Sequence, residues 1–123
     1  MSTESAIRYA QDPDNPTLLY TYLDDCDQRA ALASTIQAQR LYRHAFELLL
    51  DVISDDCVPR HWRALCLDHV YRTLVGLARL AESDRDLQGL LELESQLRVT
   101  AEFFLGKAQV CGSLPARGAV ASA

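Results

Sequence analysis

Residues 59–80 read PRHWRALCLDHVYRTLVGLARL and carry the broadest amphipathic pattern in the chain. Apolar or weakly polar side chains recur there at steps of three or four, which places them on one face of a helix. This stripe consists of Trp62, Cys66, His69, Thr73, Leu77 and Leu80. Pro59 suits the first helical turn, where its missing N–H costs nothing. The pattern predicts one helix of about 33 Å around which the rest of the chain packs.

Two more helices are predicted before this segment. The first begins at Asn15-Pro16, where an N-cap residue precedes a first-turn proline, and its apolar positions continue to Ala30. The second covers about Thr35 to Ile53. Its main apolar seam consists of Ala38, Tyr42, Ala45, Leu49 and Val52.

The boundary between these two helices has two interpretations. Ser34-Thr35-Ile36-Gln37 has the spacing of a capping box, which starts a new helix. Residues 30–34 contain no glycine or proline, however, so one bent helix from Pro16 to Ser54 is the alternative. Such a helix of about 39 residues would be long for a globular domain. We therefore expect a break near Ala33.

A last helix is predicted after the polar segment 82–86, with Ser83 or Asp84 as its cap. It ends at Gly106 or persists to Gly112. Glu94 interrupts the apolar seam, so either this carboxylate reaches solvent or the helix is rotated from this assignment. The expected seam consists of Leu87, Leu90, Leu97, Ala101, Phe104 and Ala108.

Four amphipathic segments joined by short links must bury their stripes against one another. The fold class predicted is all-α, an antiparallel bundle of about four helices over residues 15–111. Residues 1–14 have little apolar periodicity and are expected to form a loose arm, which Ile7 and Tyr9 could tack to the surface. Residues 112–123 are small and include glycine and proline, so a disordered tail is expected there.

Composition bounds the function. The chain has 49% hydrophobic residues and a net charge of −5, which fits a globular core and disfavours nucleic acid as a partner. No apolar run approaches the ~20 residues needed to cross a membrane. The N-terminus lacks the apolar segment of a secretory signal. We therefore expect a cytoplasmic protein whose four cysteines are reduced thiols, with no cofactor predicted.

Cys66 and His69 form the one candidate metal site, because their spacing of three residues aims both side chains from one helical face. Cys26 and Cys57 could be brought near them. The sequence has neither a Cys-x-x-Cys nor a His-Glu-x-x-His pattern. The simpler interpretation is that Cys66 is a small core residue and His69 lies hydrogen-bonded at the edge of the core.

Arg60, His61 and Arg63 crowd the start of the central helix. Free N–H groups and the helix dipole attract anions at such an end, so a carboxylate or phosphate could bind there. The alternative is a solvated ion-pair network with the nearby acids, a common arrangement that contributes little to stability. Those acids are Asp51, Asp55 and Asp56.

The sequence contains no recognisable catalytic constellation, so no catalytic residue is assigned. Trp62, the single tryptophan, heads the apolar stripe. We expect it to be a core anchor buried against the second or the last helix. The competing view makes Trp62 an exposed anchor for a partner, since tryptophan is enriched at binding hot spots.

A resemblance covers about the middle third of the chain, with a weaker part at DPDNPTLLYTYL, residues 12–23. It rests on Phe46, Leu48-Leu49-Leu50-Asp51, Pro59, His61-Trp62-Arg63, Leu65-Cys66-Leu67-Asp68 and Leu74. In these positions the sequence resembles FagA, a family of small proteins encoded beside an iron-independent fumarase and a manganese superoxide dismutase in iron-responsive operons. The resemblance implies a cytosolic protein linked to iron limitation or oxidative stress, and it transfers no activity or catalytic residue.

These observations lead to one expected function and two alternatives. We expect a non-enzymatic protein that binds another, unnamed protein as an interaction or regulatory factor, with self-association left open. The first alternative is a binder of metal or small anions that uses Cys66 and His69, or Arg60, His61 and Arg63. An enzyme comes third.

Overall fold

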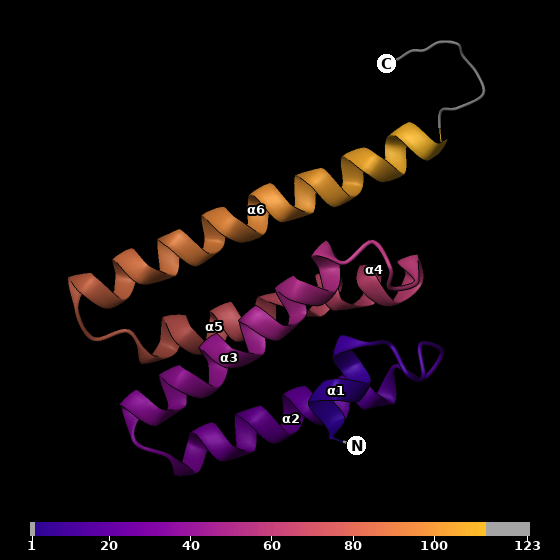
Figure 1. Ribbon diagram of the computed structural model, residues 1–123. Coiled ribbons are helices and arrows are strands. Elements are labelled where there is room, and N and C mark those ends of the chain that lie inside the picture. Colours follow the sequence, from indigo (N-terminus) through magenta and orange to yellow (C-terminus); the bar gives the residue numbers. More distant parts are fainter. Residues whose placement is uncertain (1, 113–123) are drawn as a thin grey trace.

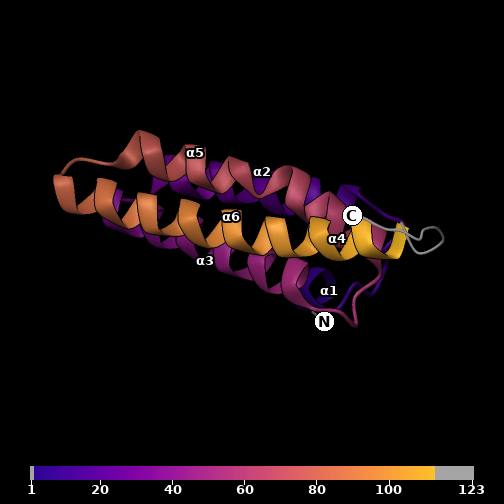
Figure 2. The same ribbon diagram turned by 90° about the horizontal axis from the view of Figure 1, so that it is seen from above.

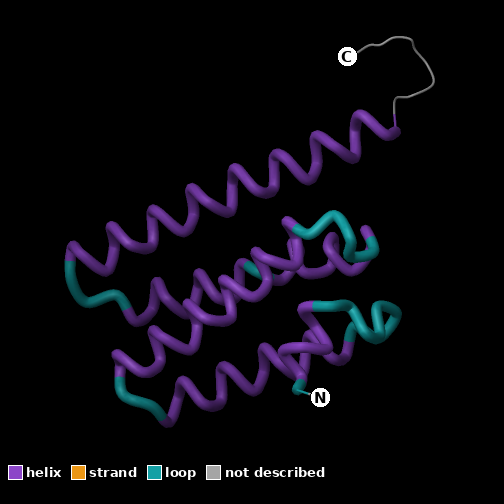
Figure 3. Tube along the Cα trace, viewed as in Figure 1, coloured by secondary structure: helices purple, strands orange, loops and turns teal. Residues whose placement is uncertain are grey.

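The computed structural model describes the backbone of residues 2–112 and the side chains of residues 2–106. Within these residues it contains helices and no strand, which confirms the all-α prediction. Successive long helices run in opposite directions, and the helix count is higher than the four expected (Figures 1 and 3). The helices are α1 (Thr3–Arg8), α2 (Thr17–Leu32), α3 (Thr35–Ser54), α4 (Arg60–His69), α5 (Tyr71–Leu80) and α6 (Asp84–Gly112).

Helix α3 lies at the centre of the fold. It packs against α1, α2, α4, α5 and α6, with α1 and α2 on one side and α6 on the other (Figures 1 and 2). The expectation that residues 59–80 organise the chain is therefore wrong. The reason is the width of the α3 stripe: its whole predicted seam is buried, and Phe46 and Ile53 are fully buried beside it.

The predicted helix of residues 59–80 is divided at Val70 into α4 and α5. The Thr73 hydroxyl donates a hydrogen bond to the Val70 carbonyl oxygen at 2.6 Å, and the Thr73 N–H donates to the same oxygen at 3.0 Å. A threonine side chain that bonds its own helix backbone bends the helix. Most of the stripe is nevertheless buried, with His69 and Leu80 partly exposed.

The predicted break between α2 and α3 is confirmed. Ser34 is the N-cap of α3, and its hydroxyl accepts from the Gln37 N–H at 3.2 Å, which completes a capping box with the Gln37 side chain. At the start of α2 the prediction was less accurate. Pro16, not Asn15, occupies the cap position, and no side chain caps this end.

The N-terminal segment is folded, contrary to the loose arm expected for residues 1–14. Ser2 caps α1 by accepting a hydrogen bond from the Ser5 N–H at 3.1 Å. Ile7 is fully buried, and Arg8 forms an ion pair with Asp55 at 2.7 Å. A helix this short buries only one residue, so its sequence shows no period, and tertiary contacts hold it.

Helix α6 continues through Gly106 to Gly112. Leu97 and Phe104 of its predicted seam are buried as expected, and the helix is turned slightly so that Leu93 joins them. Its buried face is made by Leu93, Leu97 and Phe104, whereas Leu87 is 49% exposed. The rotation carries Glu94 to the surface, which removes the conflict in the predicted seam. The side chain of Ala108 and the predicted tail from residue 113 onward lie outside the described residues. Among residues 2–112, no helix has the length and hydropathy needed to cross a membrane.

Candidate functional site

The predicted metal pair consists of one core residue and one edge residue. Cys66 is fully buried, and burial raises the pKa of its thiol to about 12, so the metal-binding thiolate is disfavoured. The His69 ring packs edge-on against Tyr20 with ring centres 5.0 Å apart. Over the side chains described, no group of three or more His, Cys, Asp or Glu residues gathers around a metal-sized space. The prediction that Cys66 is a core residue is therefore confirmed, and His69 lies at the core edge with an aromatic contact in place of the expected hydrogen bond.

The predicted anion cluster does not converge on one point, because Arg63 is turned into the protein. This side chain is buried and donates two hydrogen bonds to the Ile53 carbonyl oxygen, at 2.9 Å from Nε and 2.6 Å from Nη2. It also lies 3.5 Å from Asp56. Arg63 therefore satisfies a carbonyl in the last turn of α3 and ties α4 to it.

The two other members of the cluster have separate partners. The His61 ring nitrogen lies 3.0 Å from Asp14, and the Arg60 guanidinium stacks over the Phe104 ring with its carbon 4.6 Å from the ring centre. The predicted pairing with neighbouring acids holds only for Arg63 and Asp56, since Asp55 pairs with Arg8. The start of α4 is thus a structural junction between α1, α3 and α6.

Trp62 is fully buried, as expected for a core anchor, but its polar partner comes from α1. The indole N–H donates to the Ile7 carbonyl oxygen at 2.9 Å. A buried tryptophan normally finds such a partner for its N–H. Trp62 therefore is not an exposed anchor for another protein.

A polar network that sequence reasoning missed joins α2, α3 and α5. The Tyr42 hydroxyl and the Arg72 guanidinium each donate to Asp27 at 2.6 Å, and Arg72 also donates to Asp24 at 3.0 Å. Gly76 makes the approach possible, because a Cβ atom there would lie 2.6 Å from the Tyr42 ring. A glycine inside a predicted helix was the one signal of this close contact. The network fixes helix positions and leaves no group free for chemistry.

The surface best suited to binding is an apolar groove of about 400 Å³ between α5 and α6, here called the α5–α6 groove. Three of its large apolar side chains are about half exposed: Tyr71 (51%), Val75 (49%) and Leu105 (49%). The groove floor includes the buried Leu74 and Leu97. Apolar side chains gathered around one exposed depression are typical of binding surfaces.

Charged residues border this groove. Glu94, Arg98 and Glu102 follow one another along α6 at steps of four residues. None of the three has an ion-pair partner among residues 2–106. The border is therefore acidic by one charge and open to a partner's side chains.

Comparisons with protein-family models, with curated proteins and with solved structures found no match. Over the residues described, the protein belongs to the all-α class, with packed helices and a half-exposed apolar groove.

Proposed function

We propose that this protein is a non-enzymatic interaction factor that receives an amphipathic helix of a partner protein in the α5–α6 groove. The observation that carries the proposal is the half-exposed row of Tyr71, Val75 and Leu105 along one depression. An apolar helix face laid into such a depression is a common mode of recognition, in which a few side chains anchor the helix.

The shape of the groove supports a helix as occupant. Its α6 wall runs from Leu90 to Leu105, a distance of about 22 Å along a helix axis. Its opposite wall, α5, is also a helix. A third helix of about four turns would match that length and bury its apolar stripe against both walls.

Charge supports a basic partner over a second copy of this chain. The border holds Glu94 and Glu102 against Arg98 alone, and the whole chain carries a net charge of −5. Two copies that met at this groove would bring like charges together, whereas lysines or arginines flanking a partner's apolar stripe would pair with the glutamates.

The biological setting follows from the resemblance to FagA proteins. We place the partner among proteins that act during iron limitation or oxidative stress in the cytoplasm. This setting predicts that the complex is most abundant in iron-depleted cells.

The direct test is a binding titration with designed helices. A fluorescent peptide of about 16 residues, with leucines on one face and lysines on the other, should raise its anisotropy when the protein is added. Replacing the lysines by glutamates should weaken binding by about tenfold or more. Val75→Lys should weaken the lysine peptide similarly, because it places a charge in the groove.

Val99→Lys is the matched control. Val99 is also exposed on α6 but does not line the α5–α6 groove, so binding should be unchanged. Equal binding by the parent protein and by Val75→Lys would refute the groove as the docking surface. A concentration-dependent dimer that Val75→Lys abolishes would assign the groove to a second copy and overturn the partner-helix proposal. Affinity capture from iron-depleted cells, compared between the parent protein and Val75→Lys, then tests the setting.

A further inference from the structure

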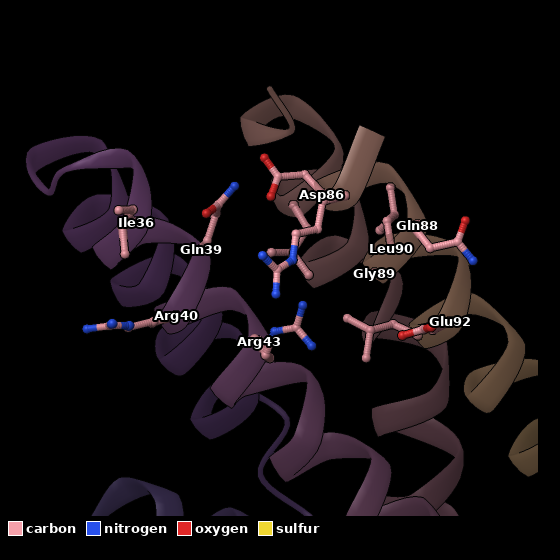
Figure 4. A pocket seen from close by; sticks show the side chains of 12 residues that line it. Ile36, Gln39, Arg40, Arg43, Asp86, Gln88, Gly89, Leu90 and Glu92 are labelled. Carbon is pink, nitrogen blue, oxygen red and sulfur yellow. The ribbon is translucent and has the colours of Figure 1, made fainter. Parts of the chain in front are cut away.

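A second depression, of about 580 Å³, lies between α3 and the first turns of α6 (Figure 4). It shares only Leu90 with the lining of the α5–α6 groove. Its size falls in the range of small-molecule sites, roughly 300 to 1,000 Å³. We call it the arginine pocket, because Arg40, Arg43 and Arg85 line it.

Four arginines outside the pocket, Arg8, Arg29, Arg63 and Arg72, have a carboxylate partner. Arg60, Arg79 and Arg98 have none among the described side chains. None of the three pocket arginines has an ion pair within residues 2–106, although acidic residues outnumber basic ones by 17 to 12 in the sequence. Arg43 reaches from α3 toward α6, while Arg40 points to the outer edge (Figure 4). Guanidinium groups that share a pocket, outnumber its carboxylates and have no ion pair favour an anion between them.

The pocket also holds two acids, Asp86 and Glu92, which balance part of the positive charge. The Asp86 carboxylate accepts a hydrogen bond from the Glu82 N–H at 3.0 Å, and this bond lowers the pKa of Asp86. Asp86 therefore stabilises the turn before α6 through this hydrogen bond. Glu92 lies further along α6 without an ion pair to the described arginines (Figure 4). The lining therefore carries three positive charges against two negative ones, a net charge of +1.

Gly89 lies beside the Arg43 guanidinium. A Cβ atom at position 89 would meet Arg43 Nη2 at 3.4 Å, and nothing else within 4 Å. Glycine is unfavourable inside a helix relative to alanine, and here no backbone packs against it in return. The absence of a side chain leaves room beside the guanidinium.

The remaining lining consists of four apolar side chains, Ile36, Leu77, Leu90 and Leu93, and two glutamines, Gln39 and Gln88. Leu77 and Leu93 are buried in the core, and Ile36 stands exposed beside them. A bare inorganic ion would leave this apolar surface uncovered. A ligand with an apolar ring or short chain beside its charged group would cover it and pair with the guanidinium groups.

We infer that the arginine pocket binds a small organic anion, an apolar body that carries one carboxylate or phosphate group. Arg43 and Arg85 bind the charged group, and Leu77 and Leu93 contact the apolar body. This inference is independent of the proposed partner helix, which docks on the other side of α6 against α5.

The test is calorimetric titration of the full chain with three probes of one shape: 1-naphthoate, 1-naphthyl phosphate and the neutral 1-naphthalenemethanol. At least one anion should bind about tenfold or more tightly than the neutral probe, and added salt should weaken it. The tighter anion identifies the charged group as carboxylate or phosphate. Equal affinity for the neutral probe and both anions, or no binding of any probe, would overturn the inference.

Variants locate the site. Arg43→Gln and Arg85→Gln should each weaken the anion by about tenfold, because each removes a charge-assisted hydrogen bond. Arg98→Gln is the matched control, an arginine without an ion pair that lies outside this pocket, and it should bind as the parent does. Gly89→Leu favours the helix yet fills the pocket, so a folded variant should lose the anion and still bind the lysine peptide. Unchanged anion binding in Arg43→Gln, or an equal loss in Arg98→Gln, would place the ligand elsewhere.

Discussion

Replacing Trp62 by alanine should remove a large part of the stability of this protein. The indole is fully buried, and its N–H bonds the Ile7 carbonyl oxygen across 55 residues of sequence. Truncation of a buried tryptophan leaves a cavity and loses transfer energy, which together cost about 3 to 5 kcal/mol. Domains of this size are stable by only about 5 to 15 kcal/mol, so Trp62→Ala should be marginally folded.

Trp62→Phe separates packing from hydrogen bonding. It keeps most of the aromatic volume and removes the N–H, so the Ile7 carbonyl oxygen loses its partner. We expect a cost of about 1 to 2 kcal/mol, the usual range for a lost hydrogen bond plus a small cavity. The variant should retain α1 in a looser contact.

Urea melts followed by circular dichroism measure both costs. With a slope of about 2 kcal/mol per molar urea, Trp62→Ala should lower the midpoint by about 2 M. Arg79→Ala, an exposed change on α5, should alter stability by less than about 0.5 kcal/mol. If Trp62→Ala unfolds at the same urea concentration as the parent, the indole is not part of the core and the placement of α1 against α4 is wrong.

Three other substitutions or reactions test the packing. Gly76→Ala should destabilise by about 1 to 3 kcal/mol in urea melts, because its Cβ would lie 2.6 Å from the Tyr42 ring and overpack the contact. A thiol reagent at pH 8 should label the exposed Cys57 at once and Cys66 only on unfolding, since burial raises the pKa of that thiol to about 12. The Asp27 pKa is lowered: burial alone would raise it, but hydrogen bonds from a tyrosine and an arginine outweigh that effect. Its stabilisation is therefore present above the unfolded pKa of about 4 and lost as pH falls through the lower folded value, so Asp27→Asn should flatten this acid limb in urea melts.

Each of these has a control. Gly106→Ala, where a Cβ meets nothing within 4 Å, should be neutral or slightly stabilising, and equal losses at both glycines would contradict the Tyr42 contact. Thiol titration of the denatured protein, kept free of oxidant, should give four thiols per chain. A result of two thiols would reveal a disulfide. Asp25→Asn changes an exposed acid of the same helix and should keep the acid limb of the parent.

Local chemistry is enough to predict the helical class and several helix boundaries. Ser34 and Gln37 form a capping box from groups only three residues apart, so a short stretch of sequence is enough to predict the break after α2. Ser83 likewise caps the start of α6, with its hydroxyl 3.1 Å from the Asp86 N–H. The buried face of α3 can be predicted from the sequence because its seven buried residues recur at helical spacing.

Tertiary structure alone decided which helix is central, how α6 is rotated and where the surface depressions lie. Ile7 meets Trp62 and Arg63 meets the Ile53 carbonyl through contacts between different helices, and no periodicity in one segment encodes them. The arginine pocket also depends on contacts between helices. Arg43 and Arg85 are distant in sequence, and they line one pocket because α6 packs on α3. An apolar stripe predicts that one face of a helix will be buried. Which helix covers that face, how the helix is rotated and which part of the stripe stays exposed depend on the packing of all the helices together.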